Sequence, residues 1–340
     1  MRGNGTGGGR GAVAGVRTPE IACDESGSDG ENLVGGNTEV FAHASVALPL
    51  ESAAECVREI RHRVRSPAEE YKANHLLREK HRAVLEWLLA PGGPVHGQAH
   101  VHLTHKAFLV VDRTVDLLLG DAADAVPLFR QGPGAFGPDG WREFLVAANG
   151  LLRVRTARVP GDDGEPFFRT VDALARARPE TEAALILRRL GAARPRADDY
   201  LDRMRTAPAL FPVLNPLFPA IRRTAAHWSA GGRTVTLVHD RQNALTPGRI
   251  ARLVQAARGE GTGLGGLRLV ASRDDARVQI ADFLAGIARR IASDELAGRG
   301  DPDLTGALRP YVGEDSLWGD EHSWSRLVPA PPGPAPRDAR

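Results

Sequence analysis

The stretch Ile21-Ala22-Cys23-Asp24-Glu25-Ser26-Gly27 is an apolar segment that ends in two carboxylates, a serine and a glycine. This pattern predicts a strand over Pro19 to Cys23 and a tight turn after it, with Asp24 presented where the strand leaves its sheet. Folds of the α/β class place their ligands at such strand ends. An ordinary turn without a ligand would have the same sequence, so the stretch alone leaves both interpretations open.

A second decisive stretch, Val278-Gln279-Ile280-Ala281-Asp282-Phe283-Leu284-Ala285-Gly286, lies near the other end of the chain. It predicts a helix over Asp275 to Ile291 in which Asp282 has small and apolar neighbours. An unpaired buried carboxylate is costly, so Asp282 should bind a metal, become protonated, or pair with an arginine such as Arg277 or Arg289. Carboxylates from distant segments, carried on rigid elements, suit a divalent-metal site for phosphate chemistry.

Two further aspartates follow apolar runs. Asp240 follows the predicted strand Thr234 to Val238, and Asp112 follows Ala107 to Val111, whose continuous apolar character predicts a fully buried strand. Either aspartate alone is compatible with an ordinary turn. If the sheet brings these strand ends together, Asp112 is as good a candidate as Asp240 for a shared site with Asp24.

Glu70 and Lys72 are two residues apart in the segment Glu-Tyr-Lys-Ala-Asn-His. On a strand they would share a face, which would give a carboxylate for a metal and an ammonium for a phosphate. The alternative is a solvated, charged helix start.

Four histidines, His96, His100, His102 and His105, form a short run. His100 and His102 on a strand would point the same way, as zinc ligands do, but no cysteine or carboxylate stands nearby in the sequence to complete a tetrahedral set. The glycine-rich stretch 259–266 is followed by neither Lys-Ser/Thr nor a helix, so it does not match a phosphate-binding loop.

Length and charge bound the class of protein. The 340 residues suggest one large domain or two smaller ones, and 44 basic against 42 acidic side chains give no overall basic field. Cys23 and Cys56 match no zinc spacing and are expected to be reduced thiols. No stretch approaches the roughly 20 apolar residues of a membrane span. The first residues lack the apolar core of a signal peptide, so a cytoplasmic location is expected.

The order of predicted elements indicates an α/β fold with an insertion. Residues 16–119 and 220–327 contain strands and helices that we interpret as two halves of one domain. Residues 120–219 have helical patterns, several prolines and few β-branched runs, which predicts a helical insertion. The glycine-rich residues 1–15 and the proline-rich residues 328–340 are expected to be a disordered leader and tail.

Taken together, four of these segments resemble the bacterial domain-of-unknown-function 3800 family, which looks like a divergent branch of the RNase H-like fold. The matching pieces occur in the family's order and span residues 16–291. They are Asp24-Glu25-Ser26-Gly27, Glu70-Tyr71-Lys72-Ala73-Asn74, Val238-His239-Asp240 and Gln279-Ile280-Ala281-Asp282-Phe283-Leu284-Ala285. The resemblance implies an RNase H-like mixed sheet flanked by helices, with an acidic, metal-dependent site formed by Asp24, Glu70, Asp240 and Asp282.

These expectations predict a metal-dependent phosphodiester hydrolase, a nuclease acting on DNA or RNA, that holds two Mg²⁺ or Mn²⁺ ions roughly 4 Å apart. Asp24 would bridge the ions, Glu70, Asp240 and Asp282 would complete their shells, and Lys72 would hold a phosphate. The alternative hypothesis is a non-catalytic module on the same fold that binds nucleic acid or a protein partner. The near-neutral charge leans slightly toward this second hypothesis.

Overall fold

The structure is a computed structural model that describes residues 18–65, 72–153, 164–206, 212–230 and 232–328. The predicted leader, Glu70 and the predicted tail beyond residue 328 lie outside these ranges.

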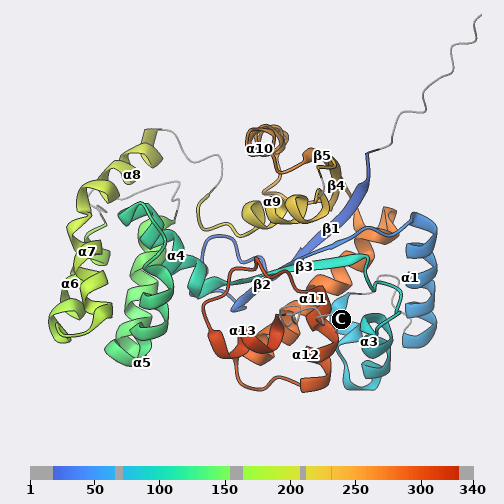
Figure 1. Ribbon diagram of the computed structural model, residues 1–340, viewed down its shortest axis with the longest axis horizontal. Coiled ribbons are helices and arrows are strands. Elements are labelled where there is room, and N and C mark those ends of the chain that lie inside the picture. Colours follow the sequence, from blue (N-terminus) through green and yellow to red (C-terminus); the bar gives the residue numbers. More distant parts are fainter. Residues whose placement is uncertain (1–17, 66–71, 154–163, 207–211, 231, 329–340) are drawn as a thin grey trace, which may run out of the picture.

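A mixed sheet of five strands forms the centre of the larger lobe (Figure 1). Along the sheet the strand order is β3-β2-β1-β4-β5. Strand β2 is antiparallel to β1 and to β3, whereas β4 is parallel to β1 and to β5. The α/β class predicted from the sequence is therefore present, with β1 as the central strand. The strands are β1 (Glu20–Ser26), β2 (Val40–Val46), β3 (Ala99–His105), β4 (Val235–Asp240) and β5 (Leu264–Val270).

Helices cover both faces of this sheet (Figure 1). Helix α11 (Ala276–Leu296) lies on one face together with α1 (Leu50–Val64), and α9 (Leu217–Trp228) lies on the other face with α10 (Pro247–Gly259). Shorter helices complete the α11 side, namely α2 (Ala73–Leu76), α3 (Arg82–Leu89), α12 (Pro302–Leu308) and α13 (Glu321–Leu327).

Side-chain alternation along β1 and β4 assigns each residue to one face. Ala22 and Val238 are buried in the apolar core that contains α11, whereas Ile21 and Leu237 are buried in the core that contains α9. Because successive side chains of a strand point to opposite faces, the even-numbered residues of β1 and β4 face α11. This alternation determines which carboxylates lie on the same face of the sheet.

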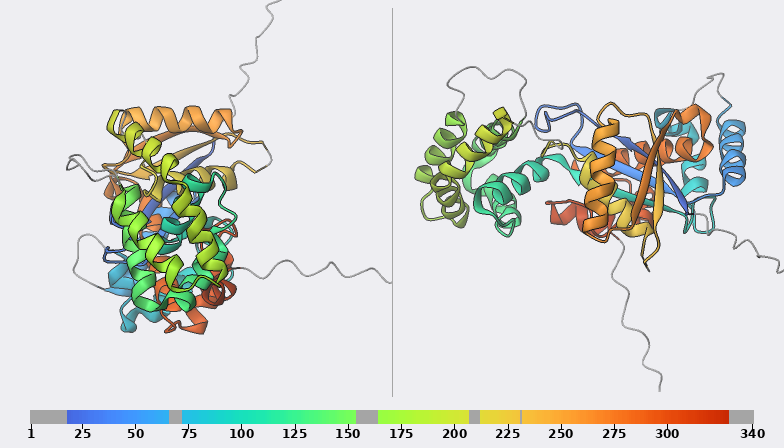
Figure 2. Two further views of the ribbon diagram at one scale, coloured as in Figure 1. Left: turned by 90° about the vertical axis from the view of Figure 1, so that its left-hand side faces the viewer. Right: turned by 90° about the horizontal axis from the view of Figure 1, so that it is seen from above.

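A bundle of helices lies beside the sheet and forms a second lobe (Figure 2). It has an apolar core of its own, and its described residues contain no strand. Residues 125–206 supply most of it, and it begins earlier than the predicted boundary at residue 120. The helices are α4 (Lys106–Leu119), α5 (Ala125–Leu152), α6 (Glu165–Ala177), α7 (Glu182–Ala192) and α8 (Arg194–Thr206).

The predicted strand Ala107 to Val111 is wrong, because these residues form the first turns of α4. Phe108, Leu109, Val110 and Val111 are all buried in this helix, between the sheet and the bundle. A helix buried all round has the same continuous apolar sequence as a buried strand, so periodicity alone does not separate the two. The strand of this region is instead the histidine-containing β3, which comes just before the helix.

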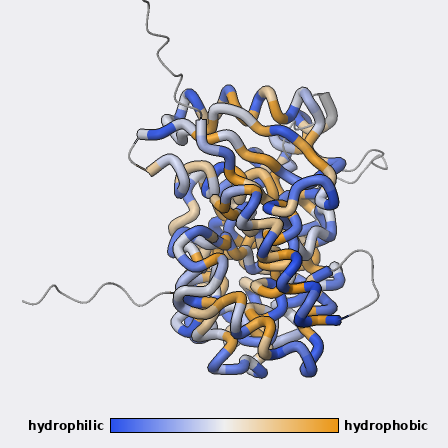
Figure 3. The backbone as a smooth tube through the Cα atoms, turned by 90° about the vertical axis from the view of Figure 1, so that its right-hand side faces the viewer, coloured by the Kyte–Doolittle hydropathy of each residue, from blue (hydrophilic) through white to orange (hydrophobic). Residues whose placement is uncertain are grey.

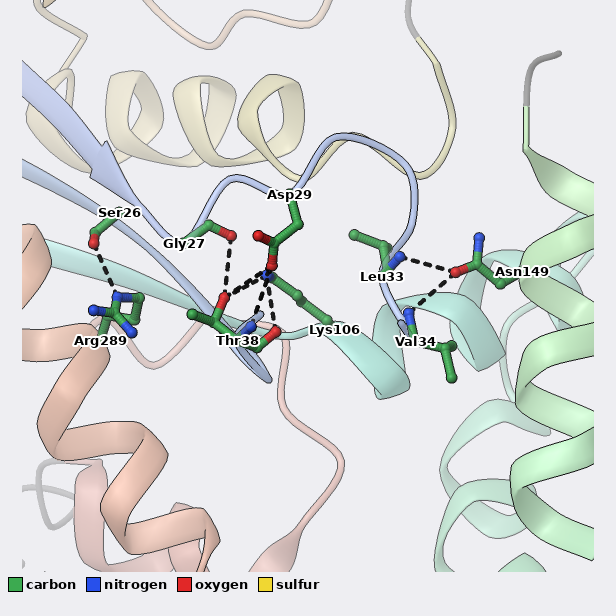
Figure 4. A network of polar contacts seen from close by, with 9 residues as sticks. All are labelled: Ser26, Gly27, Asp29, Leu33, Val34, Thr38, Lys106, Asn149 and Arg289. Atoms are coloured by element: carbon green, nitrogen blue, oxygen red, sulfur yellow. Dashed lines mark hydrogen bonds and ion pairs between the residues drawn. The ribbon is translucent and has the colours of Figure 1, made fainter. Parts of the chain in front are cut away.

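The loop between β1 and β2 connects the sheet to the helical bundle. Asn149 of α5 accepts hydrogen bonds from the backbone N–H groups of Leu33, at 2.9 Å, and Val34, at 3.1 Å. Its amide donates to the carbonyl of Glu31 at 2.8 Å. Leu33 is buried in the core of the bundle. The loop is therefore clamped at its middle by the insertion (Figure 4).

The colouring by hydropathy shows apolar stretches gathered inside the molecule and hydrophilic stretches toward the outside (Figure 3). Among the helices of the described residues, none combines the length and the apolar character needed to cross a membrane.

Candidate active site

Asp24 is a buried carboxylate inside the central strand. Strand β1 continues to Ser26, so Asp24 lies within the strand and not beyond its end as predicted. Its side chain is 6% exposed and faces α11, and its Oδ1 accepts a hydrogen bond from the Glu25 N–H at 2.8 Å. Burial, followed by repulsion from Glu25, Asp282 and Asp240, raises the pKa of Asp24 well above its usual value. A cation beside Asp24 would relieve this repulsion.

Asp282 projects from α11 toward the same region and pairs with Lys72. The Lys72 Nζ lies 3.4 Å from the Asp282 Oδ2. The expected alternatives Arg277 and Arg289 have other partners, because Arg277 binds Asp275 and Arg289 donates to Ser26. Lys72 is the N-cap residue of α2, in an extended conformation. The helix-start interpretation of this segment therefore holds from Ala73 onward.

Close packing between α11 and α2 brings Lys72 to Asp282. A Cβ placed on Gly286 would stand 2.2 Å from the Cβ of Ala73, so only glycine fits here without a shift. The small residues around Asp282 in the sequence thus serve two purposes. They surround the carboxylate with little bulk, and they let the second helix approach.

Asp240 is the last residue of β4 and runs beside Asp24. In the parallel register Cys23 is opposite His239, so the next residues on the two strands, Asp24 and Asp240, are neighbours. Both face α11. The Asp240 Oδ1 accepts a hydrogen bond at 2.9 Å from the backbone N–H of Ser272, just after β5. Asp240 therefore orders the next connection as well as lying next to Asp24.

The two remaining sequence candidates differ in outcome. Glu70 lies outside the described residues. Asp112 is on α4, not at a strand end, and its nearest charged partner is Arg113, with Nη1 3.6 Å from Oδ2. Burial raises the pKa of Asp112, while Arg113 and Arg223 of α9 oppose that shift. Because Arg223 belongs to the α9 side, Asp112 does not take the place of Asp240 beside Asp24.

The structure thus brings Asp24, Asp240 and Asp282 to one face of the sheet, with Lys72 at their edge. Asp240 and Asp282 are close enough to Asp24 for their charges to raise its pKa. Among the described residues, no three histidine, cysteine, aspartate or glutamate side chains converge closely enough to hold a metal ion. The donors that do gather are carboxylate oxygens, which fit Mg²⁺ or Mn²⁺ better than zinc.

A buried chain of polar side chains lies behind this site, on the α9 face. The His239 Nδ1–H donates to the Asp240 carbonyl at 2.9 Å, which leaves Nε2 to accept from the His43 Nε2–H at 3.2 Å. The His43 Nδ1 then accepts from the Thr224 hydroxyl at 2.9 Å. Burial lowers the pKa of His43 well below its usual value, so the His43 ring is neutral.

Glu25 connects to the same chain and was not singled out in the sequence beyond its place in the turn. Its Oε1 accepts from the Gln242 side-chain amide, and its buried Oε2 lies 3.5 Å from the His239 Nε2. The signal for this arrangement was present in the alternation of β1. Adjacent carboxylates on a strand point to opposite faces, so Asp24 and Glu25 serve different environments.

His100 and His102 of β3 also lie on the α9 face, whereas His105 contacts the rings of Phe129 and Trp318. The ring of His100 stacks on that of His227 with centroids 3.8 Å apart, and the His102 Nδ1 lies 3.9 Å from the Asp315 Oδ1. These contacts fill the space between β3, α9 and the segment before α13.

No protein-family model matches this chain, and searches of curated proteins and of solved structures gave no match either.

Proposed function

We propose that this protein is a metal-dependent phosphodiester hydrolase, a nuclease, built on an RNase H-like fold. The support for the fold is the mixed sheet, in which an antiparallel β3-β2-β1 meander continues into the parallel strands β4 and β5. Helices cover both faces, and the helical bundle is inserted between β3 and β4. Three of the segments that resemble the domain-of-unknown-function 3800 family lie on β1, β4 and α11, and they contain Asp24, Asp240 and Asp282.

One observation carries the functional proposal. The carboxylate of Asp24 lies on the same face as Asp240 and Asp282, and burial, with added repulsion from Glu25 and from both of these aspartates, raises its pKa. Like charges that are buried close together lower the stability of the folded protein. A bound divalent cation would turn the same arrangement into an attractive one, which is the usual reason for such a cluster.

The carboxylates would bind the metal ions, and Lys72 would bind a phosphate of the substrate. Asp24, the most buried of the three described aspartates, would hold the metal ions together with Asp240, Asp282 and Glu70. A bound pair of Mg²⁺ or Mn²⁺ ions would activate the attacking water and stabilise the leaving oxygen. The side chain of Lys72 is 50% exposed, so its ammonium can reach a phosphate oxygen of the substrate while also contacting Asp282.

A cleavage screen tests this function. Labelled single- and double-stranded DNA and RNA are incubated with the protein and Mg²⁺, Mn²⁺ or EDTA, and the products are separated by length. We expect cleavage that requires a divalent ion and disappears in Asp24→Asn. Cleavage that persists in EDTA or in the variant comes from another site or from a contaminant and contradicts the proposal.

A specific observation favours the second candidate function, a non-catalytic binding module. Without metal, Asp282 is paired with Lys72 and Asp240 with the Ser272 N–H. No three donors converge among the described residues. A degenerate site of this kind would bind nucleic acid or a protein partner without a metal ion. Nucleic-acid binding that is unaffected by Mn²⁺, with no cleavage of any substrate, is the outcome that would select this function.

A further inference from the structure

A hollow of about 520 Å³ lies between the β1–β2 loop and the C-terminal half of α11. Residues 36–39 line it from the loop, and Arg289 and Arg290 line it from the helix, with Arg299 just beyond the helix end. The hollow adjoins the candidate active site, because Arg289 contacts Ser26, two residues after Asp24 on the same face of β1.

The positive charge of this hollow is only partly neutralised. Asp294 serves two guanidinium groups, with the Arg290 Nε at 2.6 Å and an Arg299 Nη2 at 3.7 Å. Glu39 is the other acid among the lining residues. Three arginines therefore face two carboxylates. In the described part of the chain, no carboxylate lies within ion-pair distance of Arg289.

Arg289 is held in place by the turn after β1. Its Nε donates to the Ser26 hydroxyl at 2.9 Å (Figure 4). Gly27 has a φ of +87°, and a Cβ there would stand 2.4 Å from the Val40 carbonyl oxygen and 2.8 Å from the Arg289 Cδ. Ser26 and Gly27 of the Asp-Glu-Ser-Gly stretch therefore position this arginine. One guanidinium N–H is used by Ser26, and the terminal NH₂ groups remain for a ligand.

A buried lysine binds Asp29, one of the two carboxylates that attract Arg289. The side chain of Lys106 is fully buried, and its ammonium binds Asp29 and both oxygens of Thr38 (Figure 4). Asp29, which attracts Arg289, is thus already bound by the Lys106 ammonium, and Asp294, the other carboxylate that attracts Arg289, pairs with Arg290 and Arg299. Burial and the neighbouring Arg290 lower the pKa of Arg289, and the attraction of Asp29 and Asp294 only partly opposes this shift.

We propose that this hollow binds a phosphate of the nucleic-acid strand that is cut at the acidic site. The inference rests on the proposed nuclease function and adds to it a second contact with the substrate. Arginine suits this role because its planar guanidinium can donate two parallel hydrogen bonds to a phosphate.

The spacing along α11 sets the register of this contact. Asp282 and Arg289 are seven residues apart, which is two helical turns on one side of the helix and about 10 Å along its axis. Phosphates of one strand of a duplex advance about 3.4 Å each along the axis. The contacted phosphate should therefore lie about three nucleotides from the scissile one, and a dinucleotide substrate should not reach it.

The test measures binding of a fluorescein-labelled 12-nucleotide single strand by anisotropy, in EDTA and over a range of salt concentrations. We expect Arg289→Gln to weaken binding about tenfold and to reduce the slope of log K against log salt by about 0.7, which is one phosphate contact. Asn37 is exposed and lines the hollow, so Asn37→Asp adds a negative charge there and should weaken binding as well. Arg252→Gln on α10, on the opposite face of the sheet, is the matched control and should bind as wild type.

Thermal melts confirm that each variant is folded. Wild-type binding in both Arg289→Gln and Asn37→Asp overturns the inference, and it leaves the nuclease proposal intact if the wild type cleaves. Weakened binding without any metal-dependent cleavage supports the phosphate contact and contradicts the nuclease. Stabilisation of the wild type by inorganic phosphate, with no binding of the strand, would identify a small anion as the occupant and overturn the inference.

Discussion

The Lys72 ammonium and the Asp282 carboxylate form an ion pair at 3.4 Å, with half of the lysine side chain exposed to solvent. An exposed pair of this kind contributes about 0–1 kcal/mol to stability. We therefore expect Asp282→Asn, without metal, to change the free energy of unfolding by less than about 1 kcal/mol, and to abolish metal-dependent cleavage. Urea unfolding and the cleavage assay measure the two effects.

Asp275→Asn is the matched control for that experiment. The Asp275 carboxylate is 6% exposed and binds the Arg277 guanidinium through both oxygens, at 3.0 and 2.7 Å. Breaking a buried pair of this kind should cost about 3–5 kcal/mol. A loss of that size in Asp282→Asn, with cleavage retained, would show that Asp282 is a structural residue.

The pH dependence of stability should report the repulsion at Asp24. Its pKa is raised in the folded protein above the ordinary value of 3.8, so the folded chain holds this proton to higher pH than the unfolded chain does. Stability from this group is therefore present below pH 3.8 and is lost as the pH rises through the folded-state pKa. Asp24→Asn should be more stable than wild type at pH 8, and this difference in the free energy of unfolding should be smaller at pH 5.

Asp301→Asn should show the opposite sign. Its hydrogen bonds to Arg82 lower the pKa of Asp301 to about 2, so its stabilisation is present above 3.8 and is lost as the pH falls through 2. The variant should be less stable than wild type at pH 8. Urea unfolding of both variants at pH 5 and pH 8 checks the signs, and an Asp24→Asn protein less stable than wild type at pH 8 would refute the repulsion.

The approach of α2 to α11 should depend on the absence of a side chain at Gly286. Gly286→Ala would place a Cβ 2.2 Å from that of Ala73, and overpacking of this kind typically costs about 1–3 kcal/mol. The second change Ala73→Gly should restore most of that loss. Gly306→Ala in α12 has nothing within 4 Å of the new Cβ and should stabilise by about 0.5–1 kcal/mol. Equal effects of the two glycine substitutions would contradict the packing shown here.

The clamp between the β1–β2 loop and the bundle should be measurable at Asn149. Asn149→Ala leaves the N–H groups of Leu33 and Val34 without their acceptor, and each buried unpaired donor costs about 1–3 kcal/mol. Asn149→Asp keeps the acceptor but places a buried carboxylate oxygen against the Glu31 carbonyl, so it should also destabilise the protein. Hydrogen exchange at Leu33 and Val34 gives a local readout, and unchanged protection in Asn149→Ala would contradict the clamp.

Some of this architecture was predictable from local sequence. The pattern around Asp282 indicated an aspartate within an apolar helix, and Gly286 is small because another helix approaches it. The apolar segment before Asp24 indicated a strand of the sheet. These are properties of one element and its nearest neighbours, so they leave a direct mark on the sequence.

Other features depend on contacts that no local pattern contains. In the run Ala107 to Val111, the four successive residues from Phe108 onward are all buried, so its helical period is hidden. The strand β3 carries His100 and His102 on a buried face, where polar residues usually argue against a core strand. The partner of Asp282 is set by how α2 docks, and sequence spacing pointed to arginines of its own helix.

The most direct test of the acidic site is titration calorimetry with Mn²⁺ on the wild type, Asp24→Asn and Asp282→Asn. Asp112→Asn is the control, because that carboxylate lies on α4 with Arg113 and away from the site. We predict that the wild type and Asp112→Asn bind Mn²⁺ alike, and that the other two variants bind at least about tenfold more weakly, because each loses a charged ligand. Absence of binding to the wild type, or equal affinity in all four proteins, would contradict a metal site at Asp24 and Asp282.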